Sequence, residues 1–99
     1  TIRTTTHTID NANFISQELI KRKLSHCITI KSCTSNFIWD NELKNDKQFD
    51  IEIKTKIQKM KKILDIINSI HKYECPEIIS NEFVILNDKY KDWFDSKCP

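Results

Sequence analysis

The chain contains no glycine in its 99 residues, although average usage would give about seven. Glycine-rich loops that cradle phosphate groups are therefore excluded. Backbone positions with positive φ must be occupied by other residues, and asparagine and aspartate tolerate that conformation best. The sequence also lacks the run of about 18 apolar residues that a transmembrane helix needs, so we expect no direct membrane insertion.

An excess of charge of one sign is also lacking. Sixteen lysines and arginines stand against fourteen aspartates and glutamates, which leaves a net charge of +2, and the two signs alternate along the chain. Proteins that bind duplex nucleic acid usually carry a basic stripe, so nucleic acid is not an expected partner. We expect the lysine-rich face with Lys56, Lys59 and Lys62 to be solvated surface.

No Cys-x-x-Cys pair is present, so the cysteine spacing indicates neither a structural zinc site nor a thioredoxin-like motif. The four cysteines, Cys27, Cys33, Cys75 and Cys98, allow three disulfide pairings. Small secreted scaffolds usually contain more cysteine, so we expect reduced thiols and favour a cytoplasmic location. The sequence begins at Thr1 without an initiator methionine, which leaves room for a targeting segment.

Apolar spacing predicts two helices. Asp10 is the expected N-cap of a first helix over 12–24, and a second helix is expected over 56–70. Pro76 cannot continue the second helix, so 73–75 are expected to form a connector. The predicted inward positions follow three-and-four spacing and are Ala12, Ile15, Leu19, Ile20 and Leu24 in the first helix and Ile57, Met60, Ile63, Leu64, Ile67 and Ile70 in the second.

Four strands and a closing helix complete the predicted fold. Strands are expected over 2–8, over 27–39, around 49–54 and over 78–86, with a turn at Asp40-Asn41. A short C-terminal helix has Tyr90, Trp93 and Phe94 on one face. The order predicts a single α+β domain over 1–99, a ferredoxin-like βαββαβ sandwich with a long hairpin between its second and third strands.

The second and third strands are unusually long, at about 12 to 14 residues against a usual 5 to 6. Such a strand reaches about 40 Å, whereas a 14-residue helix covers about 21 Å. The helices therefore cannot cover the hairpin, whose far end carries Phe37, Ile38, Trp39 and Leu43. We expect association into an oligomer to cover it. The alternative is a bulge near Ser32 and Cys33 that folds the hairpin back onto its own subunit.

Five segments resemble motifs of one known family. They are KLSHC at 23–27, TSNFIW at 34–39, IKT at 53–55, HKYECPEII at 71–79 and YKDW at 90–93. The corresponding motifs, KLAAC, TS-x-Y-x-W, IKT, HPYEVPEII and DYLxW, are those of the CutA divalent-cation-tolerance family. Among the departures, Asn41 replaces a glycine of the family and Lys72 replaces a proline.

The resemblance implies a ferredoxin-like homotrimer whose long hairpins pair across subunits. It also implies an association with tolerance of divalent metals, and with copper binding in some members. We therefore predict a trimeric protein that binds copper or a related divalent ion in the response to metal ions, with no organic cofactor. The alternatives are a PII-like signalling trimer that binds a small ligand, by analogy of fold alone, and a scaffold that anchors another protein.

Three residues are candidate metal ligands on the basis of this resemblance. Cys27, His71 and Cys75 are chosen because soft metals prefer thiolate and imidazole donors. The resemblance places Cys27 on a central strand and His71 at the histidine of the family. The alternative is that Cys27 is a small buried apolar residue and His71 a hydrogen-bonded helix end.

A second candidate site consists of Trp39, Lys54, Tyr73 and Glu77, which resemble the polar cluster that the family has near its subunit junctions. Lys54 and Glu77 are expected to bind an anionic or zwitterionic ligand between aromatic walls. The alternative is a salt bridge between subunits beside packed rings. Since no nucleophile with a convincing base is predicted, we do not expect an enzyme.

Overall fold

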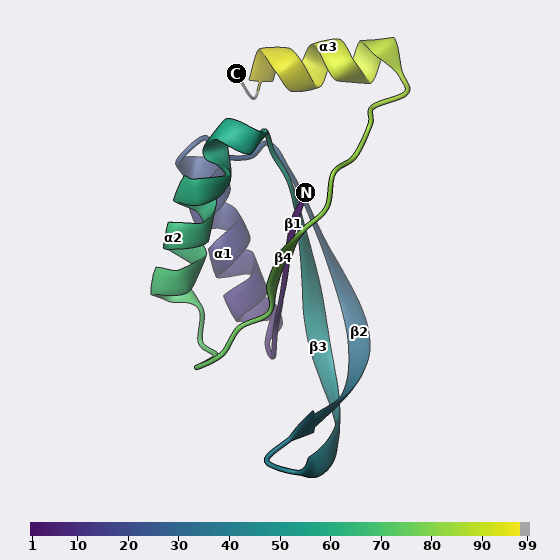
Figure 1. The fold of residues 1–99 in the computed structure, drawn as a ribbon. Coiled ribbons are helices and arrows are strands. Elements are labelled where there is room, and N and C mark those ends of the chain that lie inside the picture. The colour runs from purple at the N-terminus through teal and green to yellow at the C-terminus, as the bar shows by residue number, and fades with distance from the viewer. Residues whose placement is uncertain (98–99) are drawn as a thin grey trace.

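The computed structural model describes residues 1–97 and contains a four-stranded antiparallel sheet (Figure 1). In chain order its elements are β1 (Ile2–Thr6), α1 (Ile9–Lys21), β2 (Cys27–Trp39), β3 (Glu42–Lys54), α2 (Met60–Ile70), β4 (Ile78–Ser80) and α3 (Asp88–Lys97). A short 3-10 turn over Ile57–Lys59 precedes α2. The sheet order β2-β3-β1-β4 confirms the predicted ferredoxin-like arrangement.

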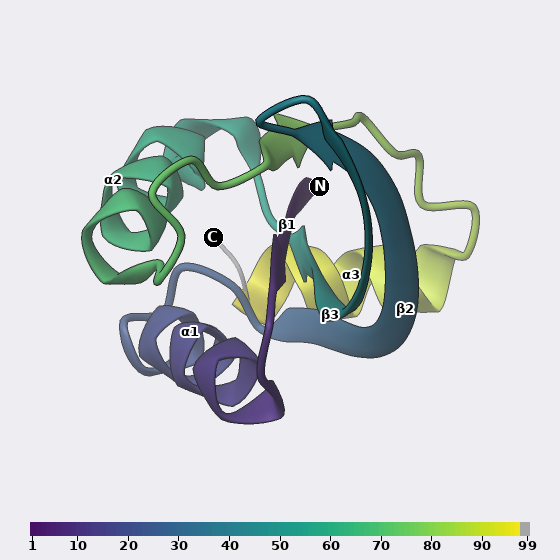
Figure 2. The same ribbon diagram turned by 90° about the horizontal axis from the view of Figure 1, so that it is seen from below.

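The core lies between the sheet and the pair of helices α1 and α2, which pack on one face (Figure 2). Successive side chains of a strand point to opposite faces, so alternate residues of β3 point toward the helices. The other face of the sheet is left open by α1 and α2. Fully buried side chains of the core are Ile15 and Leu19 from α1, Ile51 and Ile53 from β3, and Ile63 and Ile67 from α2.

The first helix starts and ends earlier than predicted. Thr8, and not Asp10, is its N-cap, because the Thr8 hydroxyl accepts a hydrogen bond from the Asn11 backbone N–H at 3.1 Å. The helix ends at Lys21, so Leu24 lies beyond it, although it is buried. Ile20, predicted to face inward, is exposed because it lies just outside the inward stripe of α1.

In the second helical segment, two predicted inward positions are exposed. Ile57 belongs to the 3-10 turn, where the helical spacing of α2 does not apply, and its side chain lies in solvent. Leu64 follows the fully buried Ile63 and lies at the edge of the inward face. Ile63 and Ile67 are the side chains of α2 that enter the core.

The fourth strand is much shorter than the predicted 78–86. β4 contains three residues, paired with β1 from Thr4↔Ile78 to Ile2↔Ser80. Thr1 and Asn81 then exchange two hydrogen bonds of 2.7 and 2.9 Å between their backbone groups. The following residues have no regular structure, and Leu86 among them is 92% exposed.

The hairpin of β2 and β3 is uninterrupted. Each strand has 13 residues, and the register runs without a break from Cys27↔Lys54 to Trp39↔Glu42. The predicted alternative of a bulge near Ser32 and Cys33 is therefore wrong. Asp40 and Asn41 both have positive φ, as a two-residue hairpin turn requires.

Much of this hairpin extends past the rest of the sheet (Figure 1). β1 pairs with β3 only from Phe49 to Ile53, so among residues 1–97 no third strand lies beside the part between Phe49 and the turn. Near the turn, Ile38 is 72% and Leu43 is 79% exposed. The hairpin helps to make the molecule 47 Å long but only 27 and 21 Å across.

α3 lies beyond the opposite end of the sheet from the hairpin turn (Figure 1). Phe94 is buried and contacts the ring of Phe83 edge to face, with centroids 5.9 Å apart. Asp95 forms an ion pair of 3.5 Å with Lys56. The predicted apolar face of this helix is therefore present, although Trp93 is 40% exposed.

Candidate functional site

A cavity of about 730 Å³ lies where the hairpin projects past the rest of the sheet. Its walls include three aromatic rings, those of Phe37 and Trp39 from β2 and of Tyr73 from the connector between α2 and β4. Its volume falls within the range of about 300 to 1,000 Å³ that is usual for small-molecule sites.

The hairpin register explains why charged groups join these rings. Residues directly opposite in antiparallel strands point to the same face, and Phe37 pairs with Lys44. Asp46 and Gln48 follow Lys44 at alternate positions of β3, so they point to that face as well. This is the face of the sheet that α1 and α2 leave open. The residues of β3 that point toward these helices occupy the other set of alternate positions.

His71 fixes the start of the connector that closes the cavity. Its Nδ1 accepts a hydrogen bond of 3.0 Å from the Tyr73 backbone N–H, and its Nε2 lies 2.8 Å from the Thr5 carbonyl. The Nε2–H tautomer satisfies both contacts, because Nε2 then donates and Nδ1 accepts. Burial lowers the pKa of His71, while the bond to Thr5 acts in the opposite direction. The neutral ring therefore ties the connector to β1.

Tyr73 is held from a second side by β3. The Gln48 Nε2 donates a hydrogen bond of 2.8 Å to the Tyr73 hydroxyl oxygen. Burial raises the pKa of Tyr73, and the nearby charge of Asp46 acts in the same direction. The ring of His7 contacts the Tyr73 ring edge to face, with centroids 4.5 Å apart. The aromatic wall of the cavity is thus fixed in place by contacts from β1 and β3.

The charged residues that line the cavity are mainly acidic. Asp46 comes from β3, and Glu74 and Glu77 come from the connector. Lys44 also lines the cavity, but its ammonium group forms an ion pair of 2.9 Å with Glu42. The cavity therefore presents more negative than positive charge.

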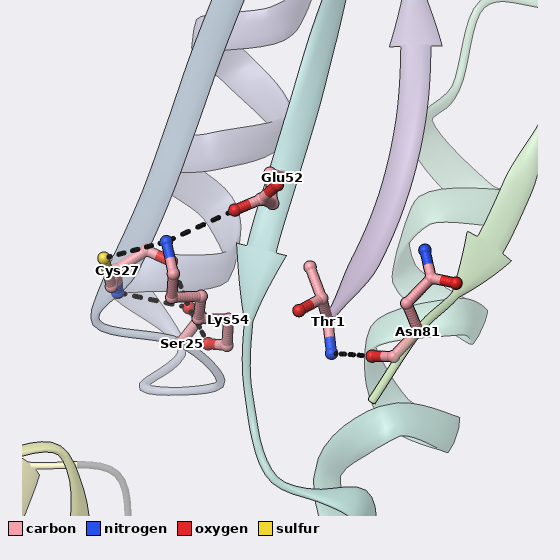
Figure 3. Close-up of polar contacts among 6 residues, drawn as sticks. All are labelled: Thr1, Ser25, Cys27, Glu52, Lys54 and Asn81. Atoms are coloured by element: carbon pink, nitrogen blue, oxygen red, sulfur yellow. Dashed lines mark hydrogen bonds and ion pairs between the residues drawn. The ribbon is translucent and has the colours of Figure 1, made fainter. Parts of the chain in front are cut away.

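A second polar cluster lies where β2 begins and β3 ends (Figure 3). The Lys54 ammonium lies 3.3 Å from Glu52 and donates to the Cys27 sulfur at 3.9 Å. The Ser25 hydroxyl donates to the Lys54 carbonyl at 2.6 Å, which joins the loop before β2 to the end of β3. A hydrogen bond with Cys27 is the main cause that raises the pKa of Tyr90, on α3, to about 12.

A match to a protein-family model over the described residues identifies the family of the chain. Residues 1–97 match the family model described as CutA1 divalent ion tolerance protein. The chain belongs to the CutA1 family. The match confirms the family that the segments 23–27 and 71–79 resemble.

Individual CutA proteins agree with this assignment. The divalent-cation tolerance protein CutA of Thermococcus kodakarensis is 26% identical over 85% of this chain and 81% of its own length. The crystal structure of the divalent ion tolerance protein CutA1 from Ehrlichia chaffeensis has 33% identity and a TM-score of 0.89, over 97% of this chain and 91% of that one. The structure of CutA from Archaeoglobus fulgidus, described as periplasmic, has a TM-score of 0.90 and 25% identity, over 97% of this chain and 94% of that one.

The compartment in which this CutA1 chain works stays a prediction. The longest described helix has 13 residues, and none of the helices in residues 1–97 could span a lipid bilayer.

The second predicted site of this CutA1 chain is only partly assembled within one subunit. Trp39, Tyr73 and Glu77 line the same cavity, whereas Lys54 belongs to the cluster around Cys27. The register explains the separation, because Lys54 lies at the end of β3 that is farthest from the hairpin turn. The four residues therefore do not line one cavity within residues 1–97.

The predicted metal ligands do not lie together in the described chain, because Cys27 begins β2 whereas His71 and Cys75 belong to the connector between α2 and β4. Cys27 pairs with Lys54, while His71 contacts Thr5, which pairs with Asp50. The two positions on β3, Asp50 and Lys54, are four residues apart, which is about 13 Å along the strand. Cys75 lies on the exposed connector. Within residues 1–97, no group of three or more His, Cys, Asp or Glu side chains is arranged to hold a metal ion in one subunit.

Sequence reasoning missed several residues of the cavity. Asp46, Gln48 and Glu74 line it, but none of them belongs to the predicted site. Asp46 and Gln48 could have been found by carrying the alternation back along the third strand from its inward residues to the turn. Glu74 is adjacent in sequence to Tyr73, but no periodicity indicates the direction of a side chain on a connector.

Proposed function

We propose that this CutA1-family chain assembles as a homotrimer and binds copper or a related divalent ion in the response to metal ions. Family membership supports the metal-ion response, because curated relatives such as the Thermococcus kodakarensis protein are divalent-cation tolerance proteins. We propose no catalytic step, since these descriptions name tolerance and no reaction.

The projecting hairpin is the observation that carries the proposal of assembly. β2 is an edge strand in the sheet, so its outer backbone groups lack a neighbouring strand in the subunit over 13 residues. Ile38 and Leu43 lie exposed near the turn, beyond the reach of α1 and α2. Soluble proteins normally cover or pair such edges and apolar surfaces. Three copies is the number that the family resemblance implies.

The thiols support the proposal of metal binding. Cys27, Cys33 and Cys75 are free in the part of the chain that the structure describes. Thiolate and imidazole donors suit copper. Because Cys27, His71 and Cys75 lie apart in one subunit, the proposed site takes donors from more than one copy in the trimer.

Isothermal titration of the reduced, full chain with Cu(I), Cu(II) and Zn(II) tests the metal site. We expect saturable binding, and a loss of affinity in the Cys27→Ser, His71→Ala and Cys75→Ser variants. The Cys33→Ser variant is the matched control, because it removes a free thiol outside the predicted set. The metal proposal is contradicted if no ion binds saturably below millimolar concentration, or if Cys33→Ser weakens binding as much as the other variants.

Sedimentation velocity tests the assembly separately. At micromolar concentration, without added metal, we expect one species of about three times the chain mass of 11.8 kDa. A single-chain species over the same concentration range would contradict the trimer.

A further inference from the structure

The fold brings two basic segments together at the end of the molecule opposite the hairpin turn. α1 ends there and α2 begins there (Figure 1). The Thr55 hydroxyl donates to the Leu24 carbonyl, and the Lys59 ammonium donates to the Lys23 carbonyl, both at 2.9 Å. These contacts join the segment after α1 to the segment before α2. We call residues 18–23 and 56–65 together the basic end.

The basic end carries an excess of positive charge that the rest of the chain lacks. Its two segments contain seven basic and two acidic residues, whereas the rest of the chain contains nine basic and twelve acidic residues. Three of its cations form ion pairs, namely Arg22 with Glu18, Lys61 with Asp65 and Lys56 with Asp95. The other four form no ion pair with any of the residues 1–97, and they are Lys21, Lys23, Lys59 and Lys62. The sequence of α3, which lies near this end, has three aspartates and three lysines, so it does not neutralise the excess.

Exposed aliphatic side chains lie among these charges. Ile57 is 77% exposed in the 3-10 turn, between Lys56 and Lys59. Ile20 is 42% exposed and directly precedes Lys21. A partner that is negatively charged and also accepts apolar side chains therefore complements the basic end.

The basic end lies away from the surface that the proposed trimer covers. The trimer covers the hairpin and the face of the sheet that α1 and α2 leave open. The basic end is formed instead by one end of each of these helices and by the turn before α2. Each copy in the trimer therefore keeps its basic end available to another partner.

The residue types favour a membrane surface over a nucleic acid. Proteins that bind single-stranded nucleic acid stack aromatic rings on the bases, and arginine is the residue best suited to paired hydrogen bonds with phosphate. Six of the seven basic residues are lysines, and neither segment contains an aromatic residue. Lysine ammonium groups suit the diffuse charge of anionic headgroups, and an aliphatic side chain can enter the boundary between headgroups and acyl chains.

We propose that the basic end docks on the surface of a membrane that contains anionic lipids. The four unpaired lysines lie at the headgroups, and Ile57 enters the boundary below them. Lys56, Lys59 and Lys62, which the sequence predicts to be solvated surface, thus belong to a docking surface. Neither segment contains a cysteine, so docking is independent of the metal ion of the proposed function.

Co-sedimentation of the full chain with lipid vesicles tests the proposal. We expect the chain to bind vesicles of phosphatidylcholine mixed with phosphatidylserine and not vesicles of phosphatidylcholine alone, and added salt should weaken binding by screening. Lys21→Gln and Lys62→Gln together should weaken binding at least about tenfold, since each lysine near an anionic surface contributes about fivefold. Ile57→Ser should weaken it by about threefold, because the aliphatic contact with the lipid is lost.

Matched controls separate the basic end from general charge and apolarity. Lys47→Gln and Lys72→Gln together remove two unpaired lysines from the hairpin and the connector, and they should leave vesicle binding unchanged. Ile9→Ser removes an isoleucine that is 44% exposed at the opposite end of α1, and it should also have no effect. Sedimentation velocity of each variant, without lipid, checks that its assembly is that of the wild type.

Three results would overturn the proposal. The first is binding to phosphatidylcholine vesicles as strong as that to the anionic vesicles. The second is an equal loss of binding in the control variants and in the variants of the basic end. The third is tighter binding to duplex DNA than to anionic vesicles, with Ile57→Ser neutral in both cases, which would identify the basic end as a nucleic-acid surface.

Discussion

At the residue scale, the absence of glycine means that other residues adopt positive φ, and within residues 1–97 there are three of them. Asp40 and Asn41 form the hairpin turn, and their side chains tolerate this conformation, as expected. The third is Lys23, directly after the cap of α1, with φ of 59°. The Lys23 N–H bonds to the Ile20 carbonyl and the Leu24 N–H to the Leu19 carbonyl, at 2.9 and 3.0 Å. This is a Schellman motif built with lysine where glycine is usual.

We predict that Lys23→Gly stabilises the protein. Glycine adopts positive φ without the steric conflict of a β-carbon, which stabilises the folded state. Its greater conformational freedom in the unfolded chain offsets part of this gain, so the free energy of unfolding should rise by about 0.5 to 1 kcal/mol. Urea unfolding at a fixed protein concentration measures the change. Gln17→Gly, in the exposed interior of α1, should instead destabilise by about 1 kcal/mol. A loss of stability in Lys23→Gly would contradict this account.

A second prediction at this scale concerns His71 and pH. Protonation would place a hydrogen on Nδ1, which already accepts the Tyr73 N–H. The folded pKa of His71 is lower than its ordinary value of 6.5, mainly because burial disfavours the charged ring. Between the two pKa values the unfolded chain binds more protons than the folded one, so stability rises with pH there. The contribution is complete above pH 6.5 and is lost as the pH falls through the folded pKa.

Urea unfolding of wild type and His71→Gln between pH 4.5 and 8 measures this contribution. The variant cannot titrate at this position, so its stability should fall less on acidification than that of the wild type. His26→Gln changes a histidine outside these contacts, and it should retain the pH dependence of the wild type. An identical decline in wild type and His71→Gln would show that His71 is not responsible.

At the element scale, the hairpin is the feature in which sequence pattern and structure agree best. The alternation of apolar and polar residues predicts its strands, and Asp40-Asn41 predicts its turn. Both signals lie within short segments of the sequence, so they do not depend on the rest of the fold. Ile38 and Leu43 are directly opposite each other near that turn, so their side chains share one face. This exposed apolar pair contributes little to the fold of a single subunit.

We predict that the double variant Ile38→Lys, Leu43→Lys dissociates the oligomer while the subunit keeps its fold. The two new charges lie on surface that the proposed trimer covers, and burying them without partners is costly. Sedimentation should show a shift to the single chain, and circular dichroism should retain the helix and strand signals. Ile20→Lys, on exposed surface of α1, is the matched control and should leave the assembly intact. Unchanged sedimentation of the double variant would exclude this pair from the interface.

At the scale of the whole molecule, the order of elements and the sheet were predictable, whereas the length of β4 was not. Its pattern continues to Leu86, but its pairing with β1 extends only from Thr4↔Ile78 to Ile2↔Ser80. A strand needs a neighbour, and the sequence of one segment does not indicate how far that neighbour extends. The start of α1 was misplaced for a related reason, since Thr8 and Asp10 are both good caps and the backbone before the helix decides between them.

The cavity shows the same division between local and long-range information. Trp39, Tyr73 and Glu77 were predicted together and line one cavity, because their family motifs mark them. Lys54, predicted as part of the same site, lies at the end of β3 farthest from the turn within one chain, and a motif alone does not specify such a register. The position of Tyr73 depends on the hydrogen bond that its hydroxyl accepts from Gln48 and on His71, which accepts the Tyr73 N–H and contacts Thr5 on β1. No periodicity in either segment indicates such contacts.

The projecting hairpin has a consequence for how the protein is made. In the proposed oligomer, other copies of the chain cover the exposed hairpin, so a newly synthesised chain exposes this surface until it meets them. Unpaired strands of other incompletely folded proteins can compete for the same surface. Rapid translation of one messenger RNA produces several copies of the chain close together, which favours their association with one another. Slow synthesis at a low concentration of the chain prolongs the time during which each newly synthesised copy can aggregate.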